Sequence, residues 1–531
     1  MWLFKIFAGC GGFLCAVGIA MILFSINTDL IKTRIAGIIM ASTSALMIGI
    51  CCIIAACPYP VLEIYTAADL QKVEAYMEKS AMRFNDDKKQ AKLMNDIDMS
   101  NFQFEGIDLG WNGTKTHFNG NGFALKNITL NTYGDTEKSD SGVGVFIGGG
   151  DYVRIDNLKL ENLTINYYGQ DQAVGALFGC VAGYHPQGVN IDNVYVSGQI
   201  NASSTDNVGG LVGDVYYYGR MSITNCVSEL EVNGRENVGG ILGGYTQERN
   251  ESFTEISNCE NKGVVKGNDN VGGIVGYQKR CTVNDCENVG KVISAKIAGG
   301  ITGLLTKEHT ITDSKNSGSV EGNVQTGGIV GVMEESASVK DCSNEETGKV
   351  VTFGCDEESN TKAGGIAGVV AKKSSIIGCK NAGEVSSQYS KVGGIVGYCL
   401  GSVTGCHNLG KVKGANDVGG IIGHMKNNLA VSTCSAAGEI SGALRVGGIM
   451  GRFGSDDLRT SLKSFFGKND ITIMNCNVTA TITCNAVGGG LIGLIVNDTV
   501  DGDYLETNTF EGALTVGGVA KNDLWTVQVE K

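Results

Sequence analysis

The hexapeptide Val208-Gly-Gly-Leu-Val-Gly213 decides how this 531-residue chain folds, because close copies of it recur along most of the sequence. Weaker copies begin at Val143 and Val174, and most neighbouring copies start about 28 residues apart. A repeat of this length is typical of stacked structural units, so we expect one long repeat domain instead of several globular ones. Further copies begin at Val238, Val271, Ala298, Thr326, Ala363, Val392, Val418 and Val446, and a stretched copy begins at Val487.

Each repeat unit contains three short runs of strand-forming residues, separated by polar or glycine-rich corners, as in residues 271–296. Three short strands per turn are typical of a parallel β-helix, in which each coil stacks on the previous one. We therefore predict an all-β fold, a parallel β-helix (β-solenoid) of about twelve coils over residues 141–495. With strands about 4.8 Å apart, twelve coils would form a rod of roughly 60 Å.

The glycines of the phrase would form columns in such a stack, since each copy lies over the copy in the previous coil. A glycine column lets neighbouring backbones approach closely and permits bends that a Cβ atom would forbid. The apolar residues between the glycines are the candidate core. The predicted structural glycines are Gly209, Gly210, Gly239, Gly240, Gly272, Gly273, Gly299, Gly300, Gly327, Gly328, Gly364, Gly365, Gly393, Gly394, Gly419, Gly420, Gly447 and Gly448.

A second element, Cys-x-Asn-x-Gly-x-Val, follows several copies of the glycine phrase, as in residues 286–292 and 406–412. Its asparagines would stack at one corner of the solenoid, where each side-chain amide can bond to the next amide and to the backbone. We predict that this asparagine ladder is structural and consists of Asn261, Asn288, Asn316, Asn344, Asn381 and Asn408.

Eight of the eighteen cysteines occupy the first position of that element. Equivalent residues on successive coils are about 4.8 Å apart with parallel side chains, which is long for a relaxed disulfide. Ser314 also interrupts the column, so neither of the two blocks pairs completely. We expect a reduced, buried stack, although an oxidising exterior would favour disulfides. The column contains Cys226, Cys259, Cys286, Cys342, Cys379, Cys406, Cys434 and Cys476.

Two apolar segments, residues 6–26 and 35–57, carry no charged side chain, and each is long enough to cross a bilayer as a helix. They predict a two-helix transmembrane hairpin over residues 1–57, with a signal peptide followed by one anchor as the alternative. Lys32 and Arg34 lie between the segments, and the positive-inside rule places this connection in the cytoplasm. The solenoid would then lie outside the cell membrane.

Residues 58–140 are expected to form an N-terminal cap of one helix and several strands, and residues 496–531 a C-terminal cap. Thr66-Ala-Ala-Asp69 resembles a capping box, and Leu70, Val73 and Met77 follow it at helical spacing. This pattern predicts a single helix over residues 66–82. Such a cap would cover backbone and apolar groups that the first coil leaves exposed.

Composition and motifs restrict the function. The net charge of −13 disfavours general nucleic-acid binding, which needs a basic surface. None of the five histidines belongs to a His-Glu-x-x-His motif, and the sequence contains no Gly-x-Ser-x-Gly nucleophile or Walker-type phosphate loop. The solenoid also contains no Cys-x-x-Cys pair. We therefore expect no catalytic residue, no metal and no cofactor.

Two groups of residues are compatible with the binding of a ligand or substrate. Acidic residues such as Asp206, Asp269 and Asp417 precede glycine phrases, and a stacked acidic edge would resemble part of a polysaccharide-active β-helix enzyme. Solvated corners explain the same residues. Residues 167–168 and 216–218 are tyrosines that could stack on sugar rings or cover a flank of the solenoid.

At the glycine phrases the chain resembles the GLUG-motif family, a short repeat of bacterial surface proteins that include adhesin-like proteins and the non-catalytic part of IgA-specific metallopeptidases. The resemblance covers residues 65–495 and rests on ten in-phase copies of the phrase. It implies a β-helical, surface-exposed bacterial domain and implies no reaction. The peptidase signature is absent from this sequence.

We therefore expect a membrane-anchored, cell-surface β-solenoid that acts in adhesion, ligand binding or scaffolding without catalysis. Its ligand would be a glycan, cell wall or protein on the solenoid flank, with no nucleic acid as a partner. One alternative is a lyase-like or hydrolase-like β-helix enzyme that acts on polysaccharides. A second alternative is a structural subunit of a membrane assembly.

Overall fold

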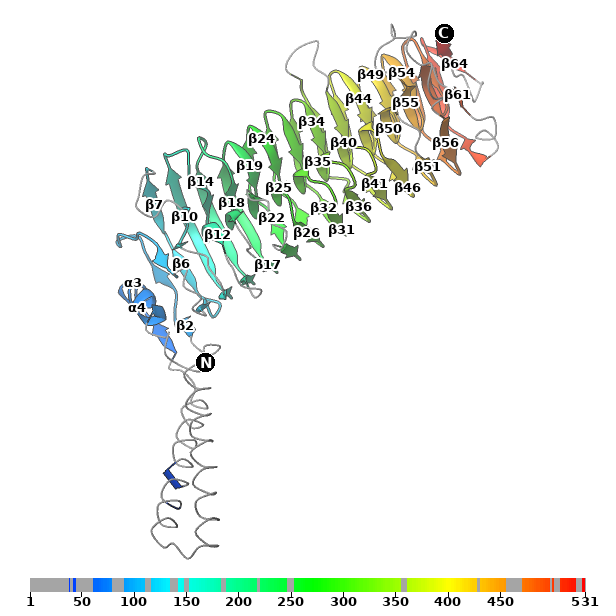
Figure 1. Cartoon of the computed structure of the whole chain (residues 1–531). Coiled ribbons are helices and arrows are strands. Elements are labelled where there is room, and N and C mark those ends of the chain that lie inside the picture. The colour runs from blue at the N-terminus through cyan, green and yellow to red at the C-terminus, as the bar shows by residue number, and fades with distance from the viewer. Residues whose placement is uncertain are drawn as a thin grey trace, which may run out of the picture.

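The computed structural model shows a long rod of stacked coils (Figure 1). Within the described part of the chain, no helix is long and apolar enough to cross a membrane. The predicted hairpin over residues 1–57 lies outside the described residues, apart from three positions in it. The structure describes residues 38, 42–43, 61–78, 90–109, 116–133, 142–147, 152–182, 188–216, 220–245, 253–354, 361–426, 430–454, 470–496, 499–500, 507–521 and 528–530.

One coil of the rod contains five short strands, which belong to four sheets. We number the sheets in the order in which the chain passes through them. The expectation of three strands per coil was wrong for two reasons. The glycine phrase bends after its second residue and so contributes to two sheets, and the run over residues 281–290 divides into one strand of sheet 3 and one of sheet 4. In one coil these are β24 (Asp269–Gly272) in sheet 1, β25 (Val275–Gln278) in sheet 2, β26 (Cys281–Asn284) in sheet 3, and β27 (Glu287–Asn288) and β28 (Val292–Ser294) in sheet 4.

The sheets run along the whole rod, so the prediction of an all-β parallel solenoid is confirmed for the described residues. Sheet 3 has 15 strands, sheet 2 has 14 and sheet 1 has 11 within these residues. Sheet 2 has twelve strands from β8 (Phe146–Ile147) to β60 (Ile492–Val496), which agrees with the twelve coils predicted over residues 141–495, and further coils lie before and after that range. Fifteen stacked strands correspond to a rod of about 70 Å. Sheet 1 extends from β11 (Val174–Gly175) to β59 (Gly488–Gly489), and sheet 2 from β4 (Ile107–Asp108) to β65 (Gln528–Glu530). Sheet 3 extends from β1 (Leu62–Ile64) to β61 (Thr499–Val500), and sheet 4 from β3 (Ile97–Asp98) to β64 (Val519–Lys521).

Stacking begins earlier than the predicted boundary at residue 141. In sheet 3, β1 pairs with β2 (Gln90–Leu93), which pairs with β5 (Thr116–Asn119), which pairs with β9 (Val153–Asp156). All of these pairs are parallel and in register, like those of the later coils. The segment predicted as a cap therefore already contains coils that lack the glycine phrase.

The core is one continuous column of apolar side chains inside the coils, from Ile64 to Leu514. Equivalent residues lie over one another, as where Val271 pairs with Ala298 and Val275 with Thr302. Both apolar residues in the middle of the phrase point away from solvent: Ile274 and Val275 are fully buried. The interior is thus filled by the same positions in every coil.

The glycines of the phrase are required because backbone of the same coil and of the next coil lies directly against them. A Cβ atom on Gly272 would collide with the carbonyl oxygen of Val275 in its own coil and with backbone of the next coil. A Cβ atom on Gly273 would collide with the Gly300 carbonyl and with the side chain of Asn288. The first glycine therefore allows the tight bend between sheets 1 and 2, and the second leaves room for the asparagine ladder.

The two ends of the rod differ from the coils between them. At the N-terminal end, α3 (Ala67–Leu70) and α4 (Lys72–Glu78) replace the single helix expected over residues 66–82, because Gln71 separates them. The Asp69 carboxylate accepts hydrogen bonds from the Thr66 backbone N–H and hydroxyl, 3.0 and 2.9 Å long, which starts the first turn. At the other end, β63 (Ala513–Val516) and β64 form an antiparallel hairpin around two glycines with positive φ.

We predict that Gly272→Val destabilises the protein by about 1–3 kcal/mol, because the new side chain meets backbone on several sides and cannot move into free space. The midpoint of urea unfolding, followed by circular dichroism, measures the effect. Lys266→Val is the matched control, since Lys266 is exposed on β23 (Val265–Gly267) and should change stability by less than about 0.5 kcal/mol. Equal midpoints for the two variants would contradict this role of the glycine.

Candidate functional site

The predicted asparagine ladder lies inside the solenoid, where all six side chains are fully buried. Each Nδ2 atom from Asn261 to Asn381 donates to the Oδ1 atom of the next asparagine, over 2.7–2.8 Å. Each amide also donates to the carbonyl of a glycine in its own coil, over 2.9–3.4 Å. Apart from Asn261 Oδ1 at its first position, the ladder therefore satisfies its buried amide oxygens, and it presents nothing to a ligand.

The eight predicted cysteines also form a buried column, and all of them are free thiols. Each Sγ atom lies 3.1–3.4 Å from the carbonyl oxygen two residues earlier in the chain. Ser314 continues the column with the same bond, 2.8 Å from the Thr312 carbonyl. A hydrogen bond with the thiol of the preceding coil (Cys379 for Cys406, and Cys406 for Cys434) and burial raise the pKa of Cys406 and of Cys434 to about 12.

Protonated, buried thiols are poor nucleophiles and poor metal ligands, because both roles need the thiolate. Among the described residues, no group of three or more His, Cys, Asp or Glu side chains is arranged to hold a metal ion. The cysteine column and the asparagine ladder thus lie in the interior, and a functional site must be sought on the outer faces.

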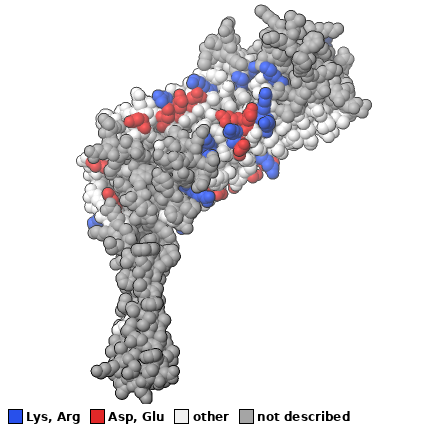
Figure 2. All heavy atoms as spheres, in the orientation of Figure 1, with Lys and Arg blue, Asp and Glu red and all other residues white. Residues whose placement is uncertain are grey.

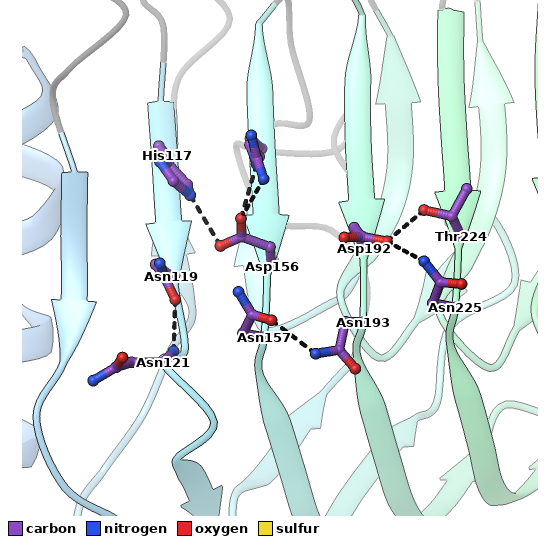
Figure 3. Close-up of polar contacts among 10 residues, drawn as sticks. His117, Asn119, Asn121, Asp156, Asn157, Asp192, Asn193, Thr224 and Asn225 are labelled. Carbon is purple, nitrogen blue, oxygen red and sulfur yellow. Dashed lines mark hydrogen bonds and ion pairs between the residues drawn. The ribbon is translucent and has the colours of Figure 1, made fainter.

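The outer face of sheet 3 carries a ladder of polar side chains near its N-terminal end, which Figure 3 shows in close-up. Arg154 and Asp156 lie on β9, His117 on β5, Asp192 on β13 (Val189–Asp192) and Thr224 on β17 (Arg220–Thr224). Asp156 is in register with Asp192, and Asp192 with Thr224. We call these residues, with the adjoining asparagines, the outer polar ladder.

Asp156 is the centre of this ladder. Its Oδ1 atom lies 2.9 Å from His117 Nε2, and its Oδ2 atom accepts a 2.8 Å hydrogen bond from Arg154 Nε. The Asp156 side chain is only 3% exposed, whereas the His117 and Arg154 side chains are 25% and 56% exposed. Burial alone would raise the pKa of Asp156, but the hydrogen bond and charge of His117 and the charge of Arg154 bring this pKa below its ordinary value.

Asp192 is bound in the same way by uncharged donors. Its Oδ1 atom accepts hydrogen bonds from Thr224 Oγ1 and Asn225 Nδ2, 2.6 and 2.7 Å long. The ladder therefore places two carboxylates in adjacent coils, beside one histidine and one arginine. Both carboxylates already accept bonds from neighbouring side chains, which leaves them poorly placed to accept a proton from a substrate.

Asparagines at the corner after sheet 3 form a second ladder that was not predicted from the sequence. Asn157, Asn193, Asn225 and Asn258 all have φ between 52° and 55°, a left-handed conformation that asparagine tolerates. The Asn193 amide donates to Asn157 Oδ1 over 2.7 Å, and Asn258 donates to Asn225. A signal was present in the sequence, since Asn225 and Asn258 each stand directly before a cysteine of the column.

Three of the acidic residues that precede glycine phrases, Asp206, Asp269 and Asp417, each bind a basic residue of the next coil. Asp206 accepts two 2.7 Å hydrogen bonds from Arg235, and Asp269 lies 3.0 Å from Lys296. Asp417 is paired with Arg445 in the same way. These three carboxylates are therefore paired with cations, and Figure 2 shows acidic and basic side chains lying beside one another on the visible face.

Two cavities lined by described residues lie away from the outer polar ladder. One, of about 540 Å³, lies between the capping helices and the first coils and is lined by residues that include Leu70, Glu74 and Phe104. The other, of about 370 Å³, is a shallow depression lined by residues that include Phe353, Glu384 and Lys413. The outer polar ladder is therefore better described as an open surface than as a catalytic cleft.

The tyrosines singled out in the sequence have different positions. Tyr167 is buried, and its hydroxyl donates to Asp171 Oδ1 over 2.7 Å; burial and this bond raise the pKa of Tyr167 to about 12. Tyr168 is exposed and stacks on Tyr133 of the preceding coil. In the other cluster, Tyr216 ends β16 (Val212–Tyr216), while residues 217–218 lie outside the described part.

No family model and no curated protein matches the chain. Among solved structures, the chain is similar to a "putative immunoglobulin A1 protease" from Bacteroides ovatus, with 15% identity and a TM-score of 0.21. The match covers 88% of this chain and 79% of that chain. A likeness at this level transfers no function, and the resemblance to the GLUG-motif family stays a prediction.

We predict that Asn316→Ala destabilises the protein about twice as much as Asn408→Ala. Asn316 has ladder bonds to both neighbours, whereas Asn408 is the last asparagine and has a ladder bond only to Asn381. Each buried amide group left without its partner costs about 1–3 kcal/mol. Urea unfolding of the two variants measures the difference, and equal losses would show that the bonds between asparagines contribute nothing.

Asp156 should make stability depend on pH in the acid range. A carboxyl whose pKa is lower in the folded state stabilises the protein above the unfolded-state pKa of about 3.9, and this contribution is lost as pH falls through the lower, folded-state value. We therefore expect Asp156→Asn to lose less stability than the wild type between about pH 5 and pH 3. Urea unfolding at several pH values tests this, with Ser222→Ala on the same face as the control that keeps the wild-type slope.

Proposed function

We propose that the protein is a membrane-anchored, cell-surface β-solenoid that binds ligands or neighbouring surfaces without catalysis. The observation that carries this proposal is the in-register repetition of side chains on flat outer faces along about fifteen coils. Each face offers many equivalent contacts at the spacing of the coils. Weak contacts repeated on one rigid body combine into strong attachment, since each additional contact forms at a high effective concentration.

The membrane anchor and the outward orientation rest on the sequence. The two apolar segments, with Lys32 and Arg34 between them, support a hairpin whose connection faces the cytoplasm. The ten copies of the glycine phrase support membership of the GLUG-motif family, whose bacterial members lie on the cell surface. The absence of recognised catalytic motifs from the sequence supports a role in adhesion or scaffolding.

One observation favours the polysaccharide-active enzyme as a second candidate. Asp156 and Asp192 lie in register in adjacent coils, close to His117 and Arg154, and paired carboxylates are the groups that hydrolyse glycosidic bonds. The non-catalytic role is preferred, because the carboxylates are bound by neighbouring donors on an open surface. Release of reducing or unsaturated sugar ends from polysaccharides, lost in Asp156→Asn, would establish the enzyme instead.

Protease treatment of intact cells tests the location. We expect a protease added outside to remove peptides of the solenoid from intact cells, because the proposed topology places residues after the second apolar segment outside. A cytoplasmic protein of the same cells is the control and should be cleaved only after lysis. Solenoid peptides that appear only after lysis would contradict the proposal.

The membrane assembly, which is the third candidate, predicts that residues 1–57 select a specific partner. We expect the full-length protein and a version carrying an unrelated two-span hairpin to attach equally well to the surface that the solenoid binds. Attachment lost on exchange of the hairpin, with the solenoid still outside the cell, would favour the assembly.

A further inference from the structure

The outer face of sheet 4 carries a neutral, aromatic platform at the N-terminal end of the rod. It is formed by the ends of β7 (Thr129–Thr132) and β10 (Lys159–Tyr167) and by β14 (Tyr195–Asn201), which pair in parallel. Figure 1 shows these strands side by side near the capping helices. We define the platform by its outward residues, which are Thr129, Asn131, Tyr133, Thr164, Asn166, Tyr168, Gln199 and Asn201.

Two stacked tyrosines are its most exposed part. The ring centroids of Tyr133 and Tyr168 are 4.9 Å apart with an angle of 22° between the rings. The two residues remain 75% and 58% exposed, which is unusual for large aromatic side chains that could have packed inside. The neighbouring Tyr167 is buried, so one of these two adjacent tyrosines packs in the interior and the other faces solvent.

Beside the tyrosines runs a row of side-chain amides. Asn166 Nδ2 donates to Asn131 Oδ1 over 2.8 Å, and Asn201 Nδ2 donates to Asn166 Oδ1 over 2.9 Å. An amide has two N–H groups and two acceptor lone pairs, so these bonds orient each amide and still leave donors and acceptors that can face solvent. Unlike the buried asparagine ladder, this row lies at the surface, where such groups can bind a ligand.

The platform carries no charge. Its outward residues are amides, hydroxyl groups and aromatic rings, and the first charged side chain in these rows is Glu231, in register with Gln199. A phosphate or carboxylate ligand would find no cation among these residues. The C–H faces of sugar rings pack on tyrosine rings, and sugar hydroxyls exchange hydrogen bonds with amides and hydroxyls.

We propose that this platform binds a neutral glycan, with the tyrosine pair packing against sugar rings and the amide row bonding to their hydroxyls. This inference rests on the proposed function as a surface ligand-binding solenoid and names the class of its ligand. Stacking also suits nucleobases, but the neutral rows and the net charge of −13 disfavour a phosphate backbone. The amide row fixes polar groups at the spacing of the coils, so the ligand is a chain of sugars and not a single ring.

The test measures binding of the purified full-length protein to immobilised neutral polysaccharides (mannan, β-1,3-glucan, xyloglucan and dextran). We expect at least one of them to bind, and we expect Tyr133→Ala and Tyr168→Ala each to weaken that binding about tenfold. Tyr168→Phe should stay within about threefold of the wild type because it keeps the ring. Asn166→Leu should weaken binding by removing the middle of the amide row.

Tyr65→Ala is the matched control, since Tyr65 is 51% exposed but directly follows β1 of sheet 3, whereas the platform lies on sheet 4. Binding to neutral polysaccharides that is unchanged in both tyrosine variants would overturn the platform while leaving a glycan-binding solenoid in place. Binding only to polygalacturonate or single-stranded oligothymidine would overturn the neutral-glycan class. A protein that binds none of these probes but still attaches to cells would overturn this inference alone, whereas loss of attachment as well would count against the proposed function.

Discussion

Parallel hydrogen bonding between successive coils is the constraint on which the rest of the structure depends. It places each residue over its counterpart one coil away, about 4.8 Å along the rod. A side chain at any position must therefore be able to pack on, or bond to, a copy of itself or a close substitute. Glycine, asparagine and cysteine meet this demand in three ways: glycine leaves no side chain, asparagine donates and accepts in one amide, and a thiol bonds to carbonyls of two coils.

The buried polar groups show how the constraint is satisfied. An isolated amide inside an apolar core would lose several hydrogen bonds, but each inner asparagine of the ladder, such as Asn316, bonds to both neighbours and to the backbone of its own coil. The second glycine of the phrase lies directly against this ladder, which explains why the two elements occur together in the repeat. Acids at the corners bind a base of the adjacent coil, as Asp206 binds Arg235.

The sequence allowed the solenoid, the glycine columns and the membership of both buried ladders to be predicted, because these features recur with one period. It did not reveal that the phrase spans two sheets, since the bend follows from backbone contacts around Gly272 that no residue pattern records. The first coils were missed because β2 and β5 stack without the phrase. The stacking of Tyr133 on Tyr168 was not predicted, because the two residues lie in two of the more divergent units. The alignment between coils is hardest to infer from sequence there.

The antiparallel hairpin of β63 and β64 has a consequence for how one molecule meets another. A parallel solenoid that simply stopped would present unpaired strand edges, and such edges are templates on which further strands can grow. In sheet 4, β64 reverses direction and pairs with β63, so an incoming parallel strand finds a partner of the wrong polarity at that position. The capping helices α3 and α4 protect the opposite end. In sheet 4, the hairpin therefore opposes the addition of another molecule's strand in the parallel direction that the coils use.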